Sequence, residues 1–276
     1  MTLHAVTDDA AKVFGRPFRL SILLCGAAIA AAAALIGNAH AQSATPACTA
    51  PDEAQRLSTP LTRTGKRIAA GEPVRIVAIG SSSTFGEGAS SPDNSYPSRL
   101  AIELKAMFPR LPIDVVNRGV NGEEAADMVA RLDSNVLAEK PDLILWQVGA
   151  NAVLRDNPIA SVRTEILEGL RRMKASGADV ILMDPQFAPK VLAKKGAADM
   201  VDLLAATAKS QDVHLFQRFA VMRHWHKTAH IPFETFISPD ELHMNDWSYG
   251  CVARLLAGAI AEAATRSTLT ARAGAR

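Results

Sequence analysis

Five short apolar runs, separated by segments of helical periodicity, constrain the fold of this chain more than any other feature. Each run is nearly continuous and β-branched, whereas a strand with one wet face would alternate apolar and polar residues. Strands buried on both faces are therefore predicted. The runs are Val74–Gly80, Ile113–Asn117, Asp142–Gly149, Asp179–Pro185 and Val213–Gln217.

The segments between these runs repeat apolar residues at helical spacing. Strands that alternate with helices in this way predict an α/β fold, with a doubly wound, five-stranded parallel sheet and helices on both of its faces. No linker divides residues 74–264, so they are expected to form one domain. The predicted helix faces are Ala125, Val129, Leu132 and Val136; Val162, Ile166, Leu170 and Met173; and, in the final helix, Val252, Leu255, Leu256 and Ala259.

Residues 1–41 have the organisation of a secretory signal peptide. Two arginines precede the uncharged run Leu20–Gly37, and the small residues Ala39 and Ala41 follow it. Cleavage before Gln42 is expected, which predicts an exported protein, periplasmic or secreted, with no stable membrane insertion afterwards. The alternative is a retained membrane anchor, because the run approaches the roughly 20 residues that span a bilayer.

The two ends of the remaining chain are simpler in composition. Residues 42–73 are rich in Ala, Thr, Ser and Pro, and are expected to form an N-terminal lead with one short helix. Residues 265–276 are expected to form a flexible tail. Two cysteines, Cys48 and Cys251, remain after cleavage. In an exported protein they form either a disulfide between the lead and the last helix or two separate buried thiols, and the sequence leaves both open.

The charge balance gives no reason to expect nucleic acid or another polyanion as a partner. The formal net charge is +2, and it falls to +1 without residues 1–41. With 48% hydrophobic and 21% charged residues, the composition is that of an ordinary globular enzyme.

Polar residues follow the predicted strands where ligands bind in sheets of this type, at the carboxyl ends. The first four strands are followed by "GSSST", "NRGVNGE", "GANA" and "DPQFAPK", and "SPDELHMND" precedes the final helix. Together these segments supply a serine nucleophile, a histidine base, an acid to orient it and donors for an oxyanion. This set predicts serine-based acyl transfer.

Three competing motifs are incomplete. The turn at Gly80 lacks the last glycine of the G-x-S-x-G elbow of α/β-hydrolases. No G-K-[ST] follows to make a phosphate-binding loop, and Ser91 stands where a dinucleotide fingerprint has its third glycine.

In these motifs the chain resembles the SGNH, or GDSL-type, hydrolases, over roughly residues 74–264. The resemblance implies an SGNH-hydrolase, flavodoxin-like α/β fold and an esterase that needs no cofactor. The matching residues are Ser82, two after Gly80; Gly119; Gly149 and Asn151 of a G-x-N block; and Asp240 and His243 of a D-x-x-H block. Ser81 stands in place of the name-giving aspartate, and Ala152 stands where many relatives have Asp.

The resemblance assigns a role to each matched residue. Ser82 is the expected nucleophile, His243 the general base and Asp240 the acid that orients it. The expected oxyanion donors are the backbone N–H groups of Ser82 and Gly119 and the side-chain amide of Asn151. No metal ion is expected to take part.

The expected substrate is a carboxylic ester, most simply a short-chain ester or an O-acetylated saccharide. A lysophospholipase, a thioesterase and an O-acyltransferase could use the same residues. A binding module for glycans that has lost activity is an alternative of another class, supported only by Ala152.

A histidine cluster in "RHWHKTAH" also needs an interpretation. His226 and His230 have the spacing of a zinc-binding helix, but Lys227 stands where a metallopeptidase has Glu. We therefore expect His224, His226 and His230 to lie on the polar face of a helix or at the entrance to the site.

Overall fold

The computed structural model describes residues 45–273, with side chains described as far as residue 266. The predicted signal peptide, residues 1–41, lies outside the described residues. Among those described, no helix is both long and apolar enough to cross a bilayer.

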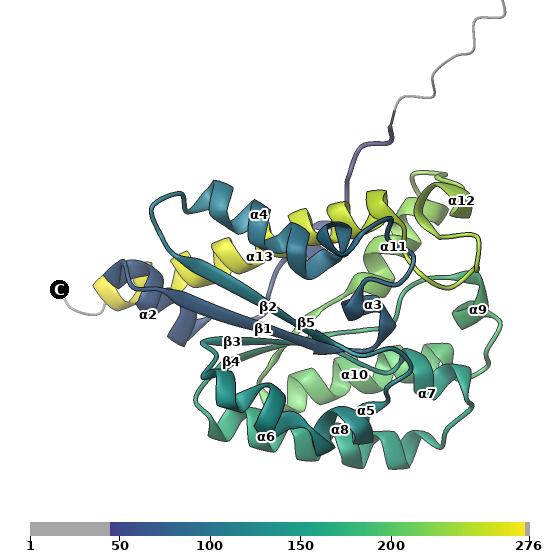
Figure 1. Ribbon diagram of the computed structural model, residues 1–276, viewed down its shortest axis with the longest axis horizontal. Coiled ribbons are helices and arrows are strands. Elements are labelled where there is room, and N and C mark those ends of the chain that lie inside the picture. Colours follow the sequence, from purple (N-terminus) through teal and green to yellow (C-terminus); the bar gives the residue numbers. More distant parts are fainter. Residues whose placement is uncertain (1–44, 274–276) are drawn as a thin grey trace, which may run out of the picture. The chain divides into compact units, whose positions relative to one another are not determined.

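The described chain folds around one parallel sheet of five strands in the order β2-β1-β3-β4-β5 (Figure 1). This confirms the predicted doubly wound architecture. Because all strands are parallel, their carboxyl ends share one edge of the sheet. The strands are β1 Val74–Gly80, β2 Ile113–Gly119, β3 Leu143–Gln147, β4 Asp179–Met183 and β5 His214–Phe216.

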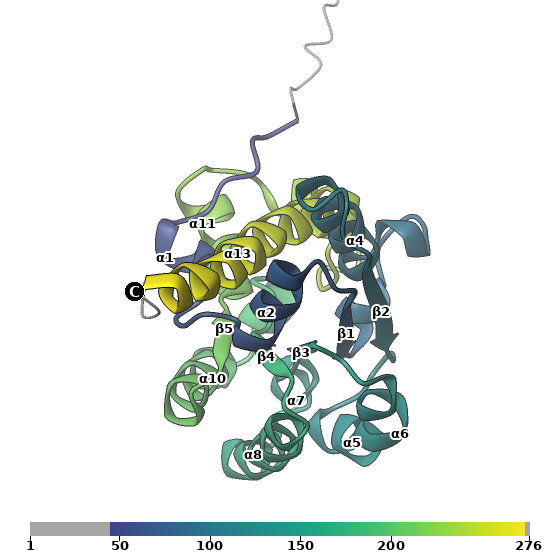
Figure 2. The same cartoon turned by 90° about the vertical axis from the view of Figure 1, so that its left-hand side faces the viewer.

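Helices cover both faces of the sheet (Figures 1 and 2). One face is covered by α2 Thr62–Ala70, α4 Tyr96–Met107 and α13 Asp246–Ala273, and the other by α5 Ala125–Ala130, α8 Ile159–Ala175 and α10 Ala197–Gln211. The shorter helices are α1 Asp52–Gln55, α3 Ser82–Phe85, α6 Leu132–Asn135, α7 Ala150–Leu154, α9 Pro189–Leu192, α11 Arg218–Lys227 and α12 Phe233–Phe236, with 3₁₀ turns at Pro92–Asn94 and Leu137–Glu139.

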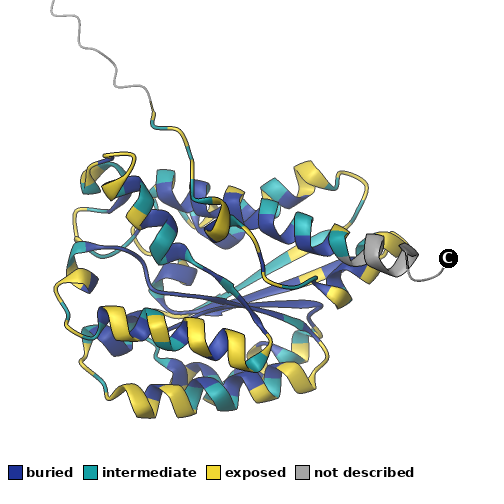
Figure 3. Cartoon of the chain, turned by 180° about the vertical axis from the view of Figure 1, so that it is seen from behind, coloured by how far each residue is buried: buried dark blue, intermediate teal, exposed yellow. Residues whose placement is uncertain are grey.

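The core lies between the sheet and these helices. Strands β1, β3 and β4 are almost entirely buried, while the outer faces of the helices are exposed (Figure 3). The predicted apolar face of α8 is buried at all four of its positions, and so is that of α13. Helix packing therefore follows the 3.6-residue period of the sequence.

The segment 125–136 is not the single helix that was expected. It divides at Arg131 into α5 and α6, although Ala125, Leu132 and Val136 are buried as predicted. The Ser134 hydroxyl donates a hydrogen bond to the Arg131 carbonyl oxygen at 3.3 Å. Side chains of Asp, Ser and Asn compete in this way with the backbone ladder, which shortens helices that contain them.

Both ends of the domain contain more helix than was predicted. Residues 45–73 contain two helices instead of one, and Leu57 and Leu61 are buried in the same core as the sheet. Helix α13 continues to Ala273, through most of the expected tail. Contacts of Arg266 support the helix beyond residue 264. Its guanidinium pairs with Glu262 and donates a hydrogen bond to the Leu57 carbonyl oxygen.

A disulfide joins Cys48 to Cys251, with Cα atoms 5.5 Å apart, so the two cysteines are not separate thiols. It fastens the residues before α1 to α13. The indole N–H of Trp225 donates to the Thr49 carbonyl oxygen at 2.7 Å, and that of Trp247 donates to the Pro46 carbonyl oxygen at 3.3 Å.

We expect the double variant Cys48→Ser/Cys251→Ser to be less stable by about 2–5 kcal/mol, because the bridge closes a long loop and restricts the unfolded chain. This corresponds to a melting temperature lower by about 5–15 °C, measured by calorimetry. Dithiothreitol should lower the melting temperature of the wild-type protein and leave that of the double variant unchanged. Equal melting temperatures for oxidised wild type and double variant would contradict this account.

Candidate active site

The serine turn at the end of β1 is built on a glycine that has no room for a side chain. A Cβ atom on Gly80 would lie 2.2 Å from the Thr84 hydroxyl oxygen and 2.7 Å from Gln147 Oε1. The chain passes through Ser81 in extended conformation, and α3 then begins at Ser82. Ser82 is half-buried, whereas Ser81, Ser83 and Thr84 are buried. Of the four hydroxyl groups, that of Ser82 is the accessible one.

Gln147, the last residue of β3, holds this turn in place. Its Oε1 accepts hydrogen bonds from the Ser81 N–H at 3.0 Å, the Ser81 hydroxyl at 3.1 Å and the Thr84 hydroxyl at 3.2 Å. The amide nitrogen of the same side chain is buried and has no hydrogen-bond partner among the described residues. Burying this N–H group without a partner costs free energy. The three hydrogen bonds that Oε1 accepts are therefore the reason we infer for a glutamine at this position.

We expect Gln147→Ala to lower kcat by about ten- to a hundredfold, because misplacing a reacting group by even 1 Å has effects of this order. Gln147→Glu keeps an accepting oxygen and should retain more of the activity. Steady-state kinetics of both variants, with melting curves, test this. If Gln147→Ala melts earlier but keeps the wild-type kcat, the role of Gln147 is structural only.

The loop before α13 brings an acid and a base to the same edge of the sheet. His243 Nε2 lies 2.8 Å from the Ser82 hydroxyl oxygen, and His243 Nδ1 is hydrogen-bonded to Asp240 Oδ2. The other carboxylate oxygen, Oδ1, accepts the backbone N–H groups of Leu242 at 3.0 Å and His243 at 2.9 Å. The three-residue spacing thus lets one carboxylate bind both the ring and the backbone of His243.

These contacts keep Asp240 ionised. Burial raises the pKa of its carboxyl group, but the hydrogen bonds from the His243 ring and the two backbone N–H groups outweigh it, so the pKa lies below its ordinary value. An ionised Asp240 favours the tautomer of His243 that carries its proton on Nδ1. Nε2 is then free to accept the proton of Ser82.

A second buried glutamine connects the serine turn to the histidine loop. Gln186 Oε1 accepts from the Ser83 hydroxyl at 3.4 Å and from the buried guanidinium of Arg218 at 3.0 Å. Its amide nitrogen donates to the Leu242 carbonyl oxygen at 3.2 Å. The neighbours of Ser82 and His243 are therefore held by one side chain.

Asn151, at the start of α7, has a fixed side chain although Ala152 follows it. One N–H of its amide donates to the Glu123 carbonyl oxygen at 2.8 Å. Glu123 is itself held by Arg131, whose guanidinium binds the carboxylate and the Arg118 carbonyl oxygen. The second N–H of the Asn151 amide has no acceptor among the described residues.

Gly119, the predicted backbone donor to the oxyanion, is the last residue of β2. Its backbone N–H already donates to Asn117 Oδ1 at 2.9 Å. A Cβ atom at this position would lie 2.1 Å from the backbone nitrogen of Phe85, so glycine is needed for the close packing of α3 on β2. The structure therefore gives Gly119 a packing role, and its assignment to the oxyanion site stays a prediction.

Gly122, in the turn after β2, is a candidate that the sequence analysis missed. It has φ of +79°, and its carbonyl oxygen accepts from Arg155 Nη2 at 2.9 Å. Its N–H has no acceptor among the described residues, and the next carbonyl along the chain, that of Glu123, binds Asn151. The pattern "NRGVNG" offered two glycines, and spacing alone did not distinguish them.

The three histidines of the cluster do not gather around a common point. The His224 ring contacts the Thr49 hydroxyl, the His226 ring stacks on Phe233 with centroids 4.0 Å apart, and His230 lies beyond α11 with φ of +54°. In the described part of the chain, no group of three or more His, Cys, Asp or Glu side chains is placed to hold a metal ion.

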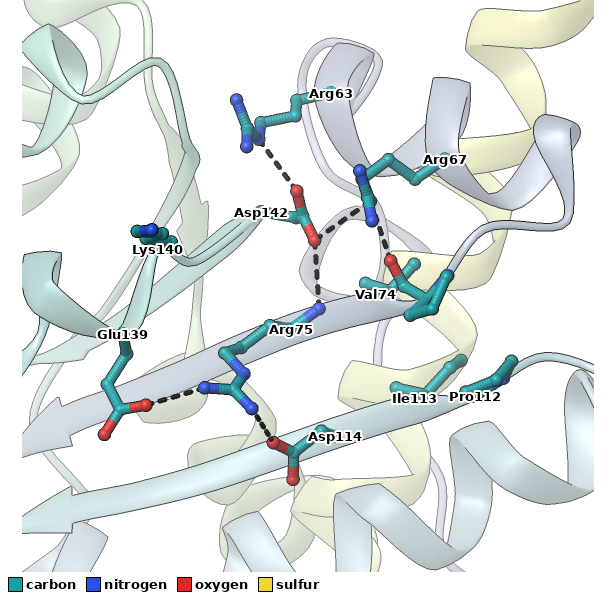
Figure 4. A pocket seen from close by; sticks show the side chains of 11 residues that line it. Arg63, Arg67, Val74, Arg75, Pro112, Ile113, Asp114, Glu139, Lys140 and Asp142 are labelled. Carbon is teal, nitrogen blue, oxygen red and sulfur yellow. Dashed lines mark hydrogen bonds and ion pairs between the residues drawn. The ribbon is translucent and has the colours of Figure 1, made fainter.

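A separate pocket of about 530 Å³ lies at the opposite edge of the sheet, where the strands begin (Figure 4). Apart from Lys140, its charged side chains pair with one another: Arg63 and Arg67 bind Asp142, and Arg75 binds Glu139 and Asp114. Since most of these charges are compensated and the serine turn lies at the other edge, we assign the chemistry to the carboxyl ends of the strands.

Comparisons with known proteins place the chain in a family. Residues 47–266 match the non-GDSL lipase-like family. An acetylxylan esterase of Geobacillus stearothermophilus is 33% identical over 98 residues, which cover 30% of this chain and 43% of that protein. An arylesterase of Vibrio mimicus is 28% identical over 127 residues, which cover 46% of this chain and 62% of that protein. The chain thus spans less than two thirds of either relative.

Solved structures show the same fold at low sequence identity. A two-domain esterase active on acetylated mannans, crystallised with mannopentaose, is 21% identical, with a TM-score of 0.64; the match covers 77% of this chain and 57% of that one. A catalytic mutant of the Geobacillus stearothermophilus acetylxylan esterase is 20% identical, with a TM-score of 0.59, over 68% of this chain and 94% of that one. The family match over residues 47–266 shows that the chain belongs to the non-GDSL lipase-like family, and the solved structures show that it shares their α/β fold.

Proposed function

We propose that the protein is a serine esterase that removes short acyl groups, acetyl above all, from saccharides. The observation that carries the proposal is the chain of contacts from Ser82 to His243 to Asp240, with the Ser82 hydroxyl 2.8 Å from His243 Nε2. A serine needs such a base, because its hydroxyl is a weak nucleophile at neutral pH.

The proposed reaction has two halves. Ser82 Oγ attacks the ester carbonyl carbon while its proton passes to His243 Nε2. As the tetrahedral intermediate collapses, the bond to the alcohol oxygen breaks, His243 gives that oxygen the proton, and the acyl group stays on Ser82. Water then attacks the acyl-serine with His243 again as base, which releases the acid and restores Ser82. Asp240 stabilises the imidazolium in both halves.

The oxyanion of each intermediate needs donors that are already in place. We propose the Ser82 N–H, at the start of α3, and the free amide N–H of Asn151. For the third donor we propose the N–H of Gly122 in place of that of Gly119, which is bound to Asn117. Each such donor is worth about 3–4 kcal/mol in the transition state.

The choice of an acetylated saccharide is supported by the proteins that the chain resembles. One relative is named an acetylxylan esterase, and one structural neighbour is described as active on acetylated mannans. The test is to incubate purified protein with acetylated xylo-oligosaccharides and with a short-chain aryl acetate and to measure acetate release. Release from both supports the proposal, and release from neither overturns it.

We also propose that the protein is exported, because residues 1–41 have the pattern of a signal peptide. Intact-mass measurement of protein recovered from outside the cytoplasm should give Gln42 as the first residue. A membrane-bound species that keeps Met1 would contradict the proposal and indicate an anchor.

A further inference from the structure

A pocket of about 580 Å³ opens beside the loop that carries Asp240 and His243. Its apolar surface comes from Pro189, Ile237 and Pro239 together with the ring of Phe233, and two carboxylates, of Glu234 and Glu241, also line it. The wall thus combines α12 with the loop of the acid and base.

The pocket adjoins the reacting groups through both catalytic segments. Gly88 lines it, and a Cβ atom on Gly88 would lie 2.9 Å from the Cβ of His243. Gly88 follows the serine helix, whose first carbonyl, that of Ser82, accepts the Glu87 N–H at 3.0 Å. Glu241 directly follows Asp240 in the chain. The pocket therefore borders both the segment that follows Ser82 and the loop that carries Asp240 and His243.

The volume of the pocket points to the alcohol part of the ester. An acetyl group has only two carbons, whereas cavities of about 300–1,000 Å³ hold whole small-molecule ligands. A compact acyl group leaves such a space empty, while a sugar ring would fill much of it.

Phe233 offers this pocket an aromatic surface that is held in place. The ring is half-buried, stacks on His226 with centroids 4.0 Å apart at 23°, and lies 5.4 Å from the ring of Phe236. The face of an aromatic ring is electron-rich and attracts positively polarised hydrogens, such as those on the C–H face of a pyranose. A fixed ring loses little entropy when it binds such a face.

The charges of the lining select among ligands. Glu234 and Glu241 are exposed carboxylates, which accept hydrogen bonds from hydroxyl groups and repel anions. No lysine, arginine or histidine side chain is among the described residues that line the pocket. The lining favours an uncharged, hydroxyl-rich group and disfavours a phosphate or a carboxylate.

We propose that this pocket is the subsite for the alcohol part of the substrate and that it takes an uncharged pyranose, stacked on Phe233, with hydroxyl groups bound by Glu234 and Glu241. The assignment rests on the esterase activity proposed above. It predicts a preference for neutral acetylated sugars over acetylated uronic acids and over lysophospholipids, which carry a phosphate.

The test compares two substrates in two variants. The substrates are an acetylated methyl xyloside and ethyl acetate, whose two-carbon alcohol is too small to fill the pocket. Phe233→Leu should lower kcat/KM for the xyloside by about tenfold, the size of a lost aromatic contact, and leave kcat/KM for ethyl acetate nearly unchanged. Phe219→Leu is the matched control, because Phe219 packs against Phe187 in the same aromatic cluster but does not line the pocket.

The role of the charges in the pocket is tested with a third substrate, an acetylated methyl glucuronide, which carries a negative charge that the xyloside lacks. Wild-type protein should prefer the xyloside, and Glu234→Gln/Glu241→Gln should reduce that preference. Equal losses on xyloside and ethyl acetate in Phe233→Leu, or a preference that the double variant leaves unchanged, would overturn the subsite. If wild-type protein cleaves none of the three esters, the esterase proposal itself fails, and the two failures are thereby distinguished.

Discussion

Ser82→Ala is expected to lose nearly all esterase activity while its melting temperature stays close to that of the wild-type protein. Removing the nucleophile of a serine hydrolase lowers kcat by about four orders of magnitude or more, because no other group can form the acyl intermediate. The residue is half-buried, and among the described residues its side chain has one hydrogen bond, to His243, so the fold loses little. Acetate release and a melting curve on the same sample measure both effects.

Ser81→Ala and Ser83→Ala are the matched controls, since they remove a hydroxyl from the same turn. Both hydroxyl groups are buried and bound, that of Ser81 to Gln147 and that of Ser83 to Gln186. Each variant should lose about 1–3 kcal/mol of stability at most and keep most of its turnover. If either control abolishes turnover while Ser82→Ala does not, the nucleophile has been assigned wrongly.

His243→Ala is expected to be as inactive as Ser82→Ala, because the base and the nucleophile act as one unit. Asp240→Asn should bind substrate normally but lower kcat by about 10⁴-fold, since an amide can hold the imidazole in the wrong tautomer. The contact of Asp240 Oδ2 with His243 Nδ1 is the one that this substitution alters. Progress curves at saturating and at low substrate separate kcat from KM.

The double variant Ser82→Ala/Asp240→Asn is the control for this second prediction. If the residues act together, it should be no slower than Ser82→Ala alone. EDTA should leave the wild-type rate unchanged. A reversible loss on chelation, restored by zinc, would contradict the mechanism and direct attention to His224, His226 and His230.

The sequence predicted the sheet because buried parallel strands leave a strong signal. Val74–Gly80 reads as a strand in the sequence and is one in the structure, with every residue except Arg75 buried. The break at Arg131 was not predictable in the same way, because the buried face continues across it and only the competing bonds of Ser134 mark it.

Within the site, the types of the residues were easier to predict than the directions in which their N–H groups and side chains point. The D-x-x-H spacing was enough to pair Asp240 with His243. Whether Gly119 or Gly122 donates to the oxyanion depends on where each backbone N–H points. A sequence motif does not contain that information. Gln147 gave no signal, because a single glutamine at a strand end has many structural uses; its meaning comes from the three donors it accepts.

The pairing of Cys48 with Cys251 had the same limit. The two residues are 203 positions apart, and only the return of α13 past the N-terminal segment brings them together. Long-range proximity of this kind is a property of the whole fold and not of either local sequence.

Labelling with a fluorophosphonate, followed by peptide mass mapping, tests the central claim most directly, since this reagent modifies only a serine that a neighbouring base has activated. The account predicts a single modified peptide with the label on Ser82. Labelling should be lost in Ser82→Ala, strongly slowed in His243→Ala, and retained in Ser81→Ala. A wild-type protein that stays unlabelled, or that carries the label on any serine other than Ser82, would contradict it.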